Sequence, residues 1–283
     1  MKHCDLDAWV NTPTDQKTRQ LRQAFHTVLH AISISPHLHK QMSIKGGILL
    51  AIVYGGSRYT RDVDFSTPEH YSKFDQAIFV TEFTENIGRA VEELDYGLDC
   101  RMQSIKVNPA KPGATFPTLT VTIGYAIKNS REHQKLLTGQ CPTIIELDYS
   151  FNEITAETEE LKIRGGGIIQ AYSLHDLIAE KYRAILQQEV RNRIRRQDAY
   201  DLYSLFKKFP TNDEHDKKRI LDSLIAKATS RGLKINRDSI SNPEIISRSR
   251  KEYDQLKMEI EEELPPFDGI YTVVREFYEN FPW

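Results

Sequence analysis

Residues 45–66 read KGGILLAIVYGGSRYTRDVDFS, and this stretch decides the fold class. A strand leads into the glycine turn at 45–47, and the apolar run 48–54 predicts a short helix. Paired glycines end that helix, since they favour a turn over a helix interior. Residues 62–65 then alternate polar and apolar, which predicts a half-buried strand. The stretch therefore predicts two strands joined by a glycine turn and a helix.

The rest of the chain divides by its hydrophobic periodicity. Helices are expected at 15–42 and 75–94, and strands at 98–107, 117–128 and 143–151. Helices are also expected at 174–190, 194–209, 214–230, 238–262 and 270–280, with Asn242-Pro243 interrupting or restarting the segment 238–262. The strongly charged stretch 251–264 is expected to be a solvated surface helix. We therefore predict an α+β protein, with a small mixed sheet flanked by helices in residues 1–165 and an all-helical domain in residues 166–283.

Bulk composition excludes several classes of protein. Hydrophobic residues make up 39% and charged residues 28% of the 283 residues, as in ordinary soluble proteins. The net charge is −2, so any site for a polyanion must be a local patch. The three cysteines form no CxxC pair, which indicates reduced thiols. No secretory signal or apolar run of about 18 residues occurs, so we expect a cytoplasmic protein with no membrane span.

Two carboxylates dominate the second strand. Asp62 and Asp64 point to one face, because side chains alternate along a strand. Their mutual repulsion would be relieved by Mg²⁺ or Mn²⁺, which prefer oxygen ligands. Asp148, in the strand-like run 144–149, is the expected third ligand, and Glu146 is the fallback. The alternative is a pair of solvent-facing aspartates on an edge strand.

The glycine turn strengthens the metal interpretation. Backbone N–H groups at a helix N-terminus bind phosphate, and glycine lets the phosphate approach closely. Gly46 and Gly47 stand at this point of the chain. A tight turn with no ligand remains open for the glycines alone.

The segment 45–66 resembles the signature of the AbiEii/AbiGii toxin family, a branch of the DNA polymerase β-like nucleotidyltransferases. Members read as a KGG turn, a helix ending in Tyr-Gly, an Arg-Tyr/Phe-Ser/Thr step and D-[IV]-D-[FL]. The matching positions are Lys45, Gly46, Gly47, Tyr54, Gly55, Arg58, Thr60, Asp62 and Asp64. Ile48 departs from the pattern, since the family often has threonine there. LIAEKYRA at 177–184 and RQDAYDLY at 196–203 resemble the family's AEKxxA and RDxxDL helices.

The resemblance implies a polymerase β-like nucleotidyltransferase domain and roles for particular residues. The implied catalytic residues are Asp62, Asp64, Asp148, Lys181, Asp198 and Asp201. The implied nucleotide-binding residues are Lys45, Gly46, Gly47, Ser57, Arg58, Thr60 and Lys181. The implied ligands of Mg²⁺ or Mn²⁺ are Asp62, Asp64 and Asp148.

Several residues keep a structural alternative. Lys181 could be a solvated surface lysine instead of a phosphate contact. Asp198 and Asp201 share a helix face, so they either orient Lys181, act as a base, or pair with nearby arginines in a structural network. The four arginines at 191–196 form either a solvated face or a site for RNA or triphosphate.

The function implied by the resemblance is that of a toxin in a type IV-like toxin–antitoxin or phage-defence system. Such an enzyme transfers NMP from an NTP to a hydroxyl and releases pyrophosphate, and a separately encoded antitoxin neutralises it. Some relatives extend the 3′ end of tRNA, so RNA, and tRNA in particular, is the favoured acceptor. Two alternatives stay open: a protein-modifying (NMPylating) enzyme, and a non-catalytic nucleotide or RNA binder.

Overall fold

The computed structural model describes residues 2–13, 15–111, 113–163, 166–209, 213–260 and 262–283. An eight-stranded mixed sheet runs through its first part in the order β1-β7-β8-β2-β3-β6-β5-β4. The strands are β1 Lys2–Cys4, β2 Ser43–Lys45, β3 Asp62–Ser66, β4 Leu98–Asn108, β5 Thr118–Ile127, β6 Ile144–Ser150, β7 Thr158–Ile163 and β8 Ile168–Tyr172. The order places β3 inside the sheet, between β2 and β6. This excludes an edge strand for the two aspartates.

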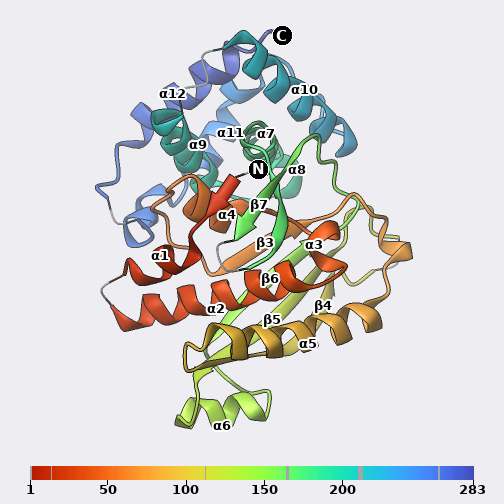
Figure 1. The fold of residues 1–283 in the computed structure, drawn as a ribbon. Helices are drawn as coiled ribbons and strands as arrows, with labels where there is room; N and C mark the ends of the chain where they lie inside the picture. The colour runs from red at the N-terminus through yellow and green to blue at the C-terminus, as the bar shows by residue number, and fades with distance from the viewer. Residues whose placement is uncertain (1, 14, 112, 164–165, 210–212, 261) are drawn as a thin grey trace. The chain divides into compact units, whose positions relative to one another are not determined.

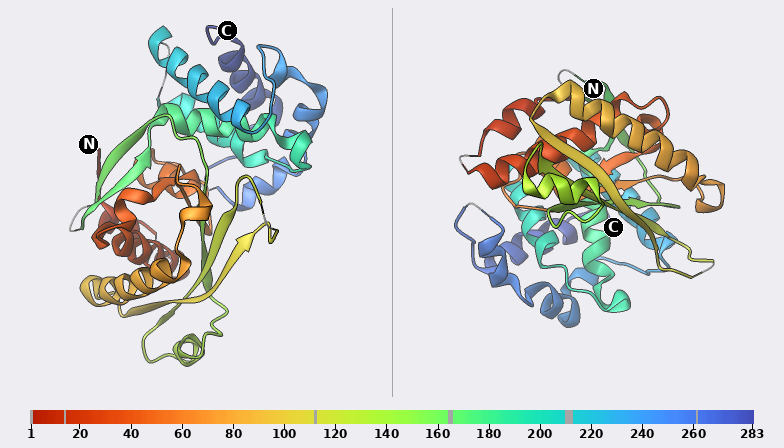
Figure 2. Two further views of the ribbon diagram at one scale, coloured as in Figure 1. Left: turned by 90° about the vertical axis from the view of Figure 1, so that its right-hand side faces the viewer. Right: turned by 90° about the horizontal axis from the view of Figure 1, so that it is seen from below.

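Two long helices cover one face of this sheet. They are α2 (Gln16–Ile34) and α5 (Gln76–Leu94), which pack on each other and on β4 (Figure 1; Figure 2 shows them from two further sides). The sheet residues beneath them are fully buried, among them Val63, Phe65 and Leu147. Because side chains alternate, the polar residues between these positions lie on the opposite face.

The decisive stretch folds as its pattern predicts. Strand β2 ends at Lys45, helix α4 follows at once as Gly46–Val53, and β3 begins at Asp62. The remaining short helices of this part are α1 Leu6–Asn11, α3 Leu38–Gln41, η1 Tyr71–Lys73 and α6 Arg131–Leu137. The alternating pattern at 62–65 reflects a strand that buries only one of its faces.

The C-terminal part is helical. Its helices are α7 Leu174–Leu186, α8 Gln188–Arg191, α9 Arg196–Lys208, α10 Glu214–Ser230, η2 Ser239–Ser241, α11 Pro243–Arg250, η3 Tyr253–Met258 and α12 Phe267–Glu279. Ser173 caps α7 by accepting a hydrogen bond from the N–H of Asp176, as expected of a serine at a helix start. None of the helices in the described ranges has the length and hydrophobicity of a membrane span.

The chain forms two compact units. The first comprises Met1–Val53, Arg61–Glu153 and Glu159–Ala171, and the second comprises Tyr54–Thr60, Ile154–Thr158 and Tyr172–Trp283. The segment 54–60 of the nucleotide-binding signature therefore belongs to the helical unit. The predicted domain boundary at residue 165 stays a prediction, and Arg164 and Gly165 lie outside the described residues.

The predicted interruption of the segment 238–262 at Asn242-Pro243 is confirmed. Asn242 caps α11 with Pro243 at its first position, and the described residues 251–260 include the 3₁₀ helix η3. Tyr253 and Leu256 are buried, so the prediction of a solvated surface helix for the charged stretch 251–264 was wrong. Proline starts helices well because it has no N–H to satisfy, and this divides the segment.

Candidate active site

Carboxylates of β3 and β6 lie on the face of the sheet opposite α2 and α5. The two strands run parallel, and their register pairs Asp62 with Glu146 and Asp64 with Asp148. Neighbouring strands lie about 4.8 Å apart, so the two carboxylates of each pair start from adjacent positions on one face of the sheet. The prediction that Asp148 lies beside the aspartate pair is confirmed by this register.

Asp148 is oriented by a hydroxyl from the next strand. Oγ1 of Thr120 donates to Oδ1 of Asp148 over 2.7 Å, and Nδ2 of Asn108 lies 3.2 Å from the same Oγ1. An amide N–H can only donate, so the Thr120 hydroxyl accepts from Asn108 and directs its own proton at the carboxylate. This chain of two hydrogen bonds favours one rotamer of Asp148.

The glycine turn lies directly against Asp64. Gly46 has a φ of +71°, a conformation that favours glycine, and a Cβ added there would stand 2.0 Å from Oδ2 of Asp64. Lys45 is the register partner of Asp64 across β2 and β3. The turn and the carboxylate are therefore packed together, and the missing side chain of Gly46 is what makes room.

Lys45 is a buried cation on the same strand pair. Its side chain is 10% exposed, and its Nζ lies 3.8 Å from Oε1 of Glu153, which is equally buried. Burying an unpaired ammonium is costly, so Glu153 stabilises its charge. The pairing keeps a positive charge next to the acidic face.

The oxygen ligands of this face fit a hard divalent cation. Asp62, Asp64 and Asp148 supply only carboxylate oxygens, which suit Mg²⁺ or Mn²⁺. The close packing of Gly46 against Asp64 leaves that carboxylate little freedom to turn away. Among the described residues, however, no three acidic, histidine or cysteine side chains already converge as a metal-binding group. The donor set and its register match such an ion, and substrate oxygens would complete the coordination, as is usual for Mg²⁺.

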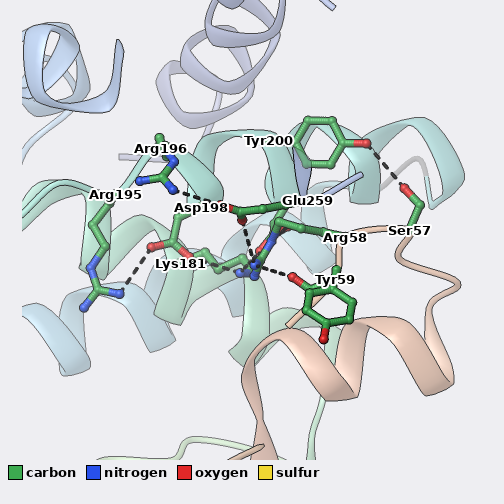
Figure 3. Close-up of polar contacts among 10 residues, drawn as sticks. Ser57, Arg58, Tyr59, Lys181, Arg195, Arg196, Asp198, Tyr200 and Glu259 are labelled. Atoms are coloured by element: carbon green, nitrogen blue, oxygen red, sulfur yellow. Dashed lines mark hydrogen bonds and ion pairs between the residues drawn. The ribbon is translucent and has the colours of Figure 1, made fainter. Parts of the chain in front are cut away.

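Lys181 is the centre of a buried ion cluster in the helical unit. Its Nζ lies 3.1 Å from Oδ1 of Asp198 and 2.6 Å from Oδ2 of Asp201, so one ammonium pairs with both carboxylates of α9. Figure 3 shows Lys181 and Asp198. The Lys181 side chain is only 6% exposed. This burial excludes the solvated-surface interpretation of Lys181.

The cluster is charged throughout. Burial by itself would lower the pKa of Lys181, but the carboxylates of Asp201 and Asp198 raise it above its usual value. Burial would raise the pKa of Asp201, but Arg58 and Lys181 hold it below its usual value. A carboxylate with a lowered pKa is a weak base. Asp201 therefore stays ionised between Arg58 and Lys181.

Arg58 joins this cluster from the segment 54–60. Its Nε and Nη2 lie 3.1 and 3.3 Å from the two oxygens of Asp201, which is a bidentate pair. Burial would lower the pKa of Arg58, but Asp201 and its neighbours raise it instead. Ser57 lies beside it, with Oγ 3.4 Å from the hydroxyl of Tyr200. Thr60 is in the same segment.

The arginines of the run 191–196 pair with different carboxylates. Nη1 of Arg195 lies 3.9 Å from Oδ2 of Asp198 and so extends the ion cluster. Arg196 turns instead to Glu259, at 2.8 Å, and to Glu252, at 3.4 Å. Figure 3 shows both arginines beside Asp198 and Glu259. The predicted alternative, in which these arginines pair with carboxylates in a structural ion-pair network, is therefore present. Asp201, however, pairs with Arg58 and Lys181.

Each unit therefore assembles part of the predicted set. The first brings together Lys45, Gly46, Gly47, Asp62, Asp64 and Asp148. The second brings together Ser57, Arg58, Lys181, Asp198 and Asp201, with Thr60 in the same segment. Sequence reasoning missed Thr120, Asn108 and Glu259. The alternation of threonines at 118, 120 and 122 was an available signal for Thr120, but nothing local marks Glu259.

The family match shows that this chain is a nucleotidyltransferase. The profile of the family described as "Nucleotidyl transferase AbiEii toxin, Type IV TA system" matches residues 28–273. The match covers most of the chain, so the protein belongs to the AbiEii nucleotidyltransferase toxin family of type IV toxin–antitoxin systems. No protein with a curated description matches the sequence at a significant level.

Two solved structures share the fold. One is MenT4, a nucleotidyltransferase toxin from Mycobacterium tuberculosis, with 14% sequence identity, a TM-score of 0.56, and coverage of 96% of this chain and 87% of that one. The other is a candidate nucleotidyltransferase from Helicobacter pylori, with 14% identity, a TM-score of 0.51, and coverage of 94% of each chain. At this identity the likeness concerns the fold, and it confirms the predicted α+β nucleotidyltransferase architecture.

Proposed function

We propose that this nucleotidyltransferase transfers NMP from an NTP to a hydroxyl of RNA, with the 3′ end of tRNA as the favoured acceptor, and that Asp62, Asp64 and Asp148 hold Mg²⁺ or Mn²⁺ for the reaction. The pairing of Asp64 with Asp148 on neighbouring strands carries this proposal. A bound ion would neutralise charge on the phosphates during the in-line displacement.

The residues of the first unit each have a defined part in this proposal. The hydrogen bond from the Thr120 hydroxyl fixes the direction of the Asp148 carboxylate. Gly46 and Gly47 open α4 without side chains, so the backbone N–H groups at its N-terminus can meet a phosphate closely. Asp64 rests against Gly46, so the ion and the phosphate-binding backbone act on the same part of the substrate.

The cations of the helical unit support phosphate binding. Lys181 and Arg58 stay protonated because Asp201 raises the pKa of each. Since the whole chain carries a net charge of −2, such local cations are the groups available to a triphosphate. Asp198 and Asp201 hold Lys181 in one direction, which is a positioning role.

The choice of RNA over protein rests on the resemblance to tRNA-extending relatives, so it needs a direct test. Purified protein would be incubated with total tRNA and each NTP labelled at the α-phosphate, with and without Mg²⁺. We expect label in the tRNA fraction, dependent on the ion. Label in protein would instead support NMPylation.

Asp64→Ala is the control for the chemistry, and Asp99→Ala is its matched acidic control on β4. Asp99 pairs with Arg101 and His133, away from the carboxylates of β3 and β6. We expect loss of transfer with Asp64→Ala alone, and growth arrest by the toxin should be lost with it. If wild type and Asp64→Ala behave alike, a non-catalytic nucleotide or RNA binder is the better description. An effect on the host would then come from binding.

The antitoxin and any role in phage defence would be sought among neighbouring genes.

A further inference from the structure

A carboxylate from the C-terminal segment bridges two arginines of the helical unit. Oε1 of Glu259 lies 2.8 Å from Nη2 of Arg196, and Oε2 lies 3.6 Å from Nη1 of Arg58 (Figure 3). Two guanidinium groups that share one planar anion also form a geometry suited to phosphate oxygens. The bridge is therefore an anion site that is filled by a side chain of the same protein.

The carboxylates around Arg58 differ in how firmly they are held. Asp201 is buried, with a side chain 3% exposed, and contacts both Arg58 and Lys181. Glu259 is 29% exposed, so its carboxylate is partly open to water. Exposed ion pairs are weak because water screens them, whereas a buried carboxylate cannot leave its cation without a large penalty. Glu259 is thus the carboxylate that an incoming anion can displace.

The backbone of Glu259 has a separate contact. Its carbonyl oxygen accepts a hydrogen bond from the N–H of Tyr59 over 2.5 Å. This bond joins the segment after η3 to the segment 54–60 without using the Glu259 side chain. The side chain can therefore move away while the two segments stay joined.

The charges favour such an exchange. Arg58, Lys181, Arg195 and Arg196 face the carboxylates of Asp198, Asp201, Glu252 and Glu259 in this cluster. With equal numbers of each sign, the cluster has little net attraction for a polyanion while Glu259 is in place. Moving Glu259 into water leaves one positive charge in excess, beside Arg58 and Arg196.

We propose that Arg58 and Arg196 form a phosphate-binding pair for the NTP, and that Glu259 occupies this pair until a phosphate replaces it. The inference rests on the proposed function, since it takes the NTP as the ligand. It adds Arg196 to the substrate contacts and gives Glu259 the part of an internal competitor. Such competition weakens NTP binding without changing the chemical step.

The test is the kinetics of Glu259→Gln, which removes the charge and keeps the size and the backbone hydrogen bond. We expect KM for the NTP to fall by roughly fivefold, with a much smaller change in kcat, because a ground-state competitor has been removed. Arg196→Gln should raise KM. The matched control is Glu252→Gln, which neutralises the other partner of Arg196 but does not reach Arg58, and it should leave KM close to that of wild type.

A binding measurement separates this inference from the proposed function. Titration with inorganic triphosphate in a calorimeter needs no acceptor, so it reports on the arginine pair even if no turnover is found with any NTP. Tighter binding by Glu259→Gln than by wild type supports the inference. An unchanged or higher KM together with unchanged triphosphate affinity overturns it, and in that case Glu259 serves only to hold the arginines.

Discussion

The close packing of Gly46 against Asp64 makes Gly46→Ala a sharp test of the site. A Cβ at position 46 would stand 2.0 Å from Oδ2 of Asp64, whereas ordinary contacts begin near 3.4 Å. The carboxylate must therefore move by more than about 1 Å, and a misplacement of about 1 Å in a catalytic group lowers the rate by about 10²-fold. We expect a loss of this size in kcat for nucleotidyl transfer.

The φ of +71° at Gly46 adds a separate penalty that needs its own control. Alanine in this region of backbone conformation costs about 1–2 kcal/mol of stability. Gly97 has a φ of +64° and no atom within 4 Å of a Cβ added there. Gly97→Ala should therefore lower the melting temperature by roughly 2–8 °C through the backbone penalty alone, while it keeps wild-type activity.

The assay is transfer of labelled NMP at saturating NTP and Mg²⁺, beside thermal melts of the same samples. A folded Gly46→Ala enzyme that turns over near the wild-type rate would refute the reasoning, because Asp64 would then not need its observed position. Equal loss of activity in both variants would point to backbone strain instead.

Three further predictions follow from single contacts. Thr120→Val should raise the Mg²⁺ concentration for half-maximal activity by about tenfold, and Thr120→Ser should not, because Asp148 loses its hydroxyl donor only in the former. Burial lowers the pKa of His26 from 6.5 to about 4, so the unfolded chain takes up this proton at a higher pH than the folded chain. The free energy of unfolding in urea should therefore be highest above pH 6.5 and fall by on the order of 3 kcal/mol toward pH 4. His26→Gln should flatten this decline. Lys181→Met should cost about 3–5 kcal/mol in urea unfolding, since it leaves buried carboxylates without their cation, and adding Asp201→Asn should recover part of that loss.

The sequence predicted the elements whose signals are local. Alternation at 62–65 placed Asp62 and Asp64 on one strand face, and the spacing of apolar residues predicted most of the long helices. An element that buries a single face has apolar residues at regular intervals, so its sequence alone shows the pattern. The strands β1, β7 and β8 were not predicted. They are short, and they are stabilised by distant partners, as β1 is by β7 and β8 by β2, so their own residues carry a weak pattern.

The resemblance at 45–66 and 177–203 pointed to the residues of the candidate site, but the contacts among them came from tertiary structure. Register between β3 and β6 decided that Asp148, and not Glu146, stands beside Asp64. Burial decided that Lys181 is a paired interior cation, and packing brought Glu259 onto Arg58 and Arg196. The spacing of apolar residues shows which face of a helix or strand is buried. Strand register and ion pairing depend on residues far apart in the chain, so only the folded protein determines them.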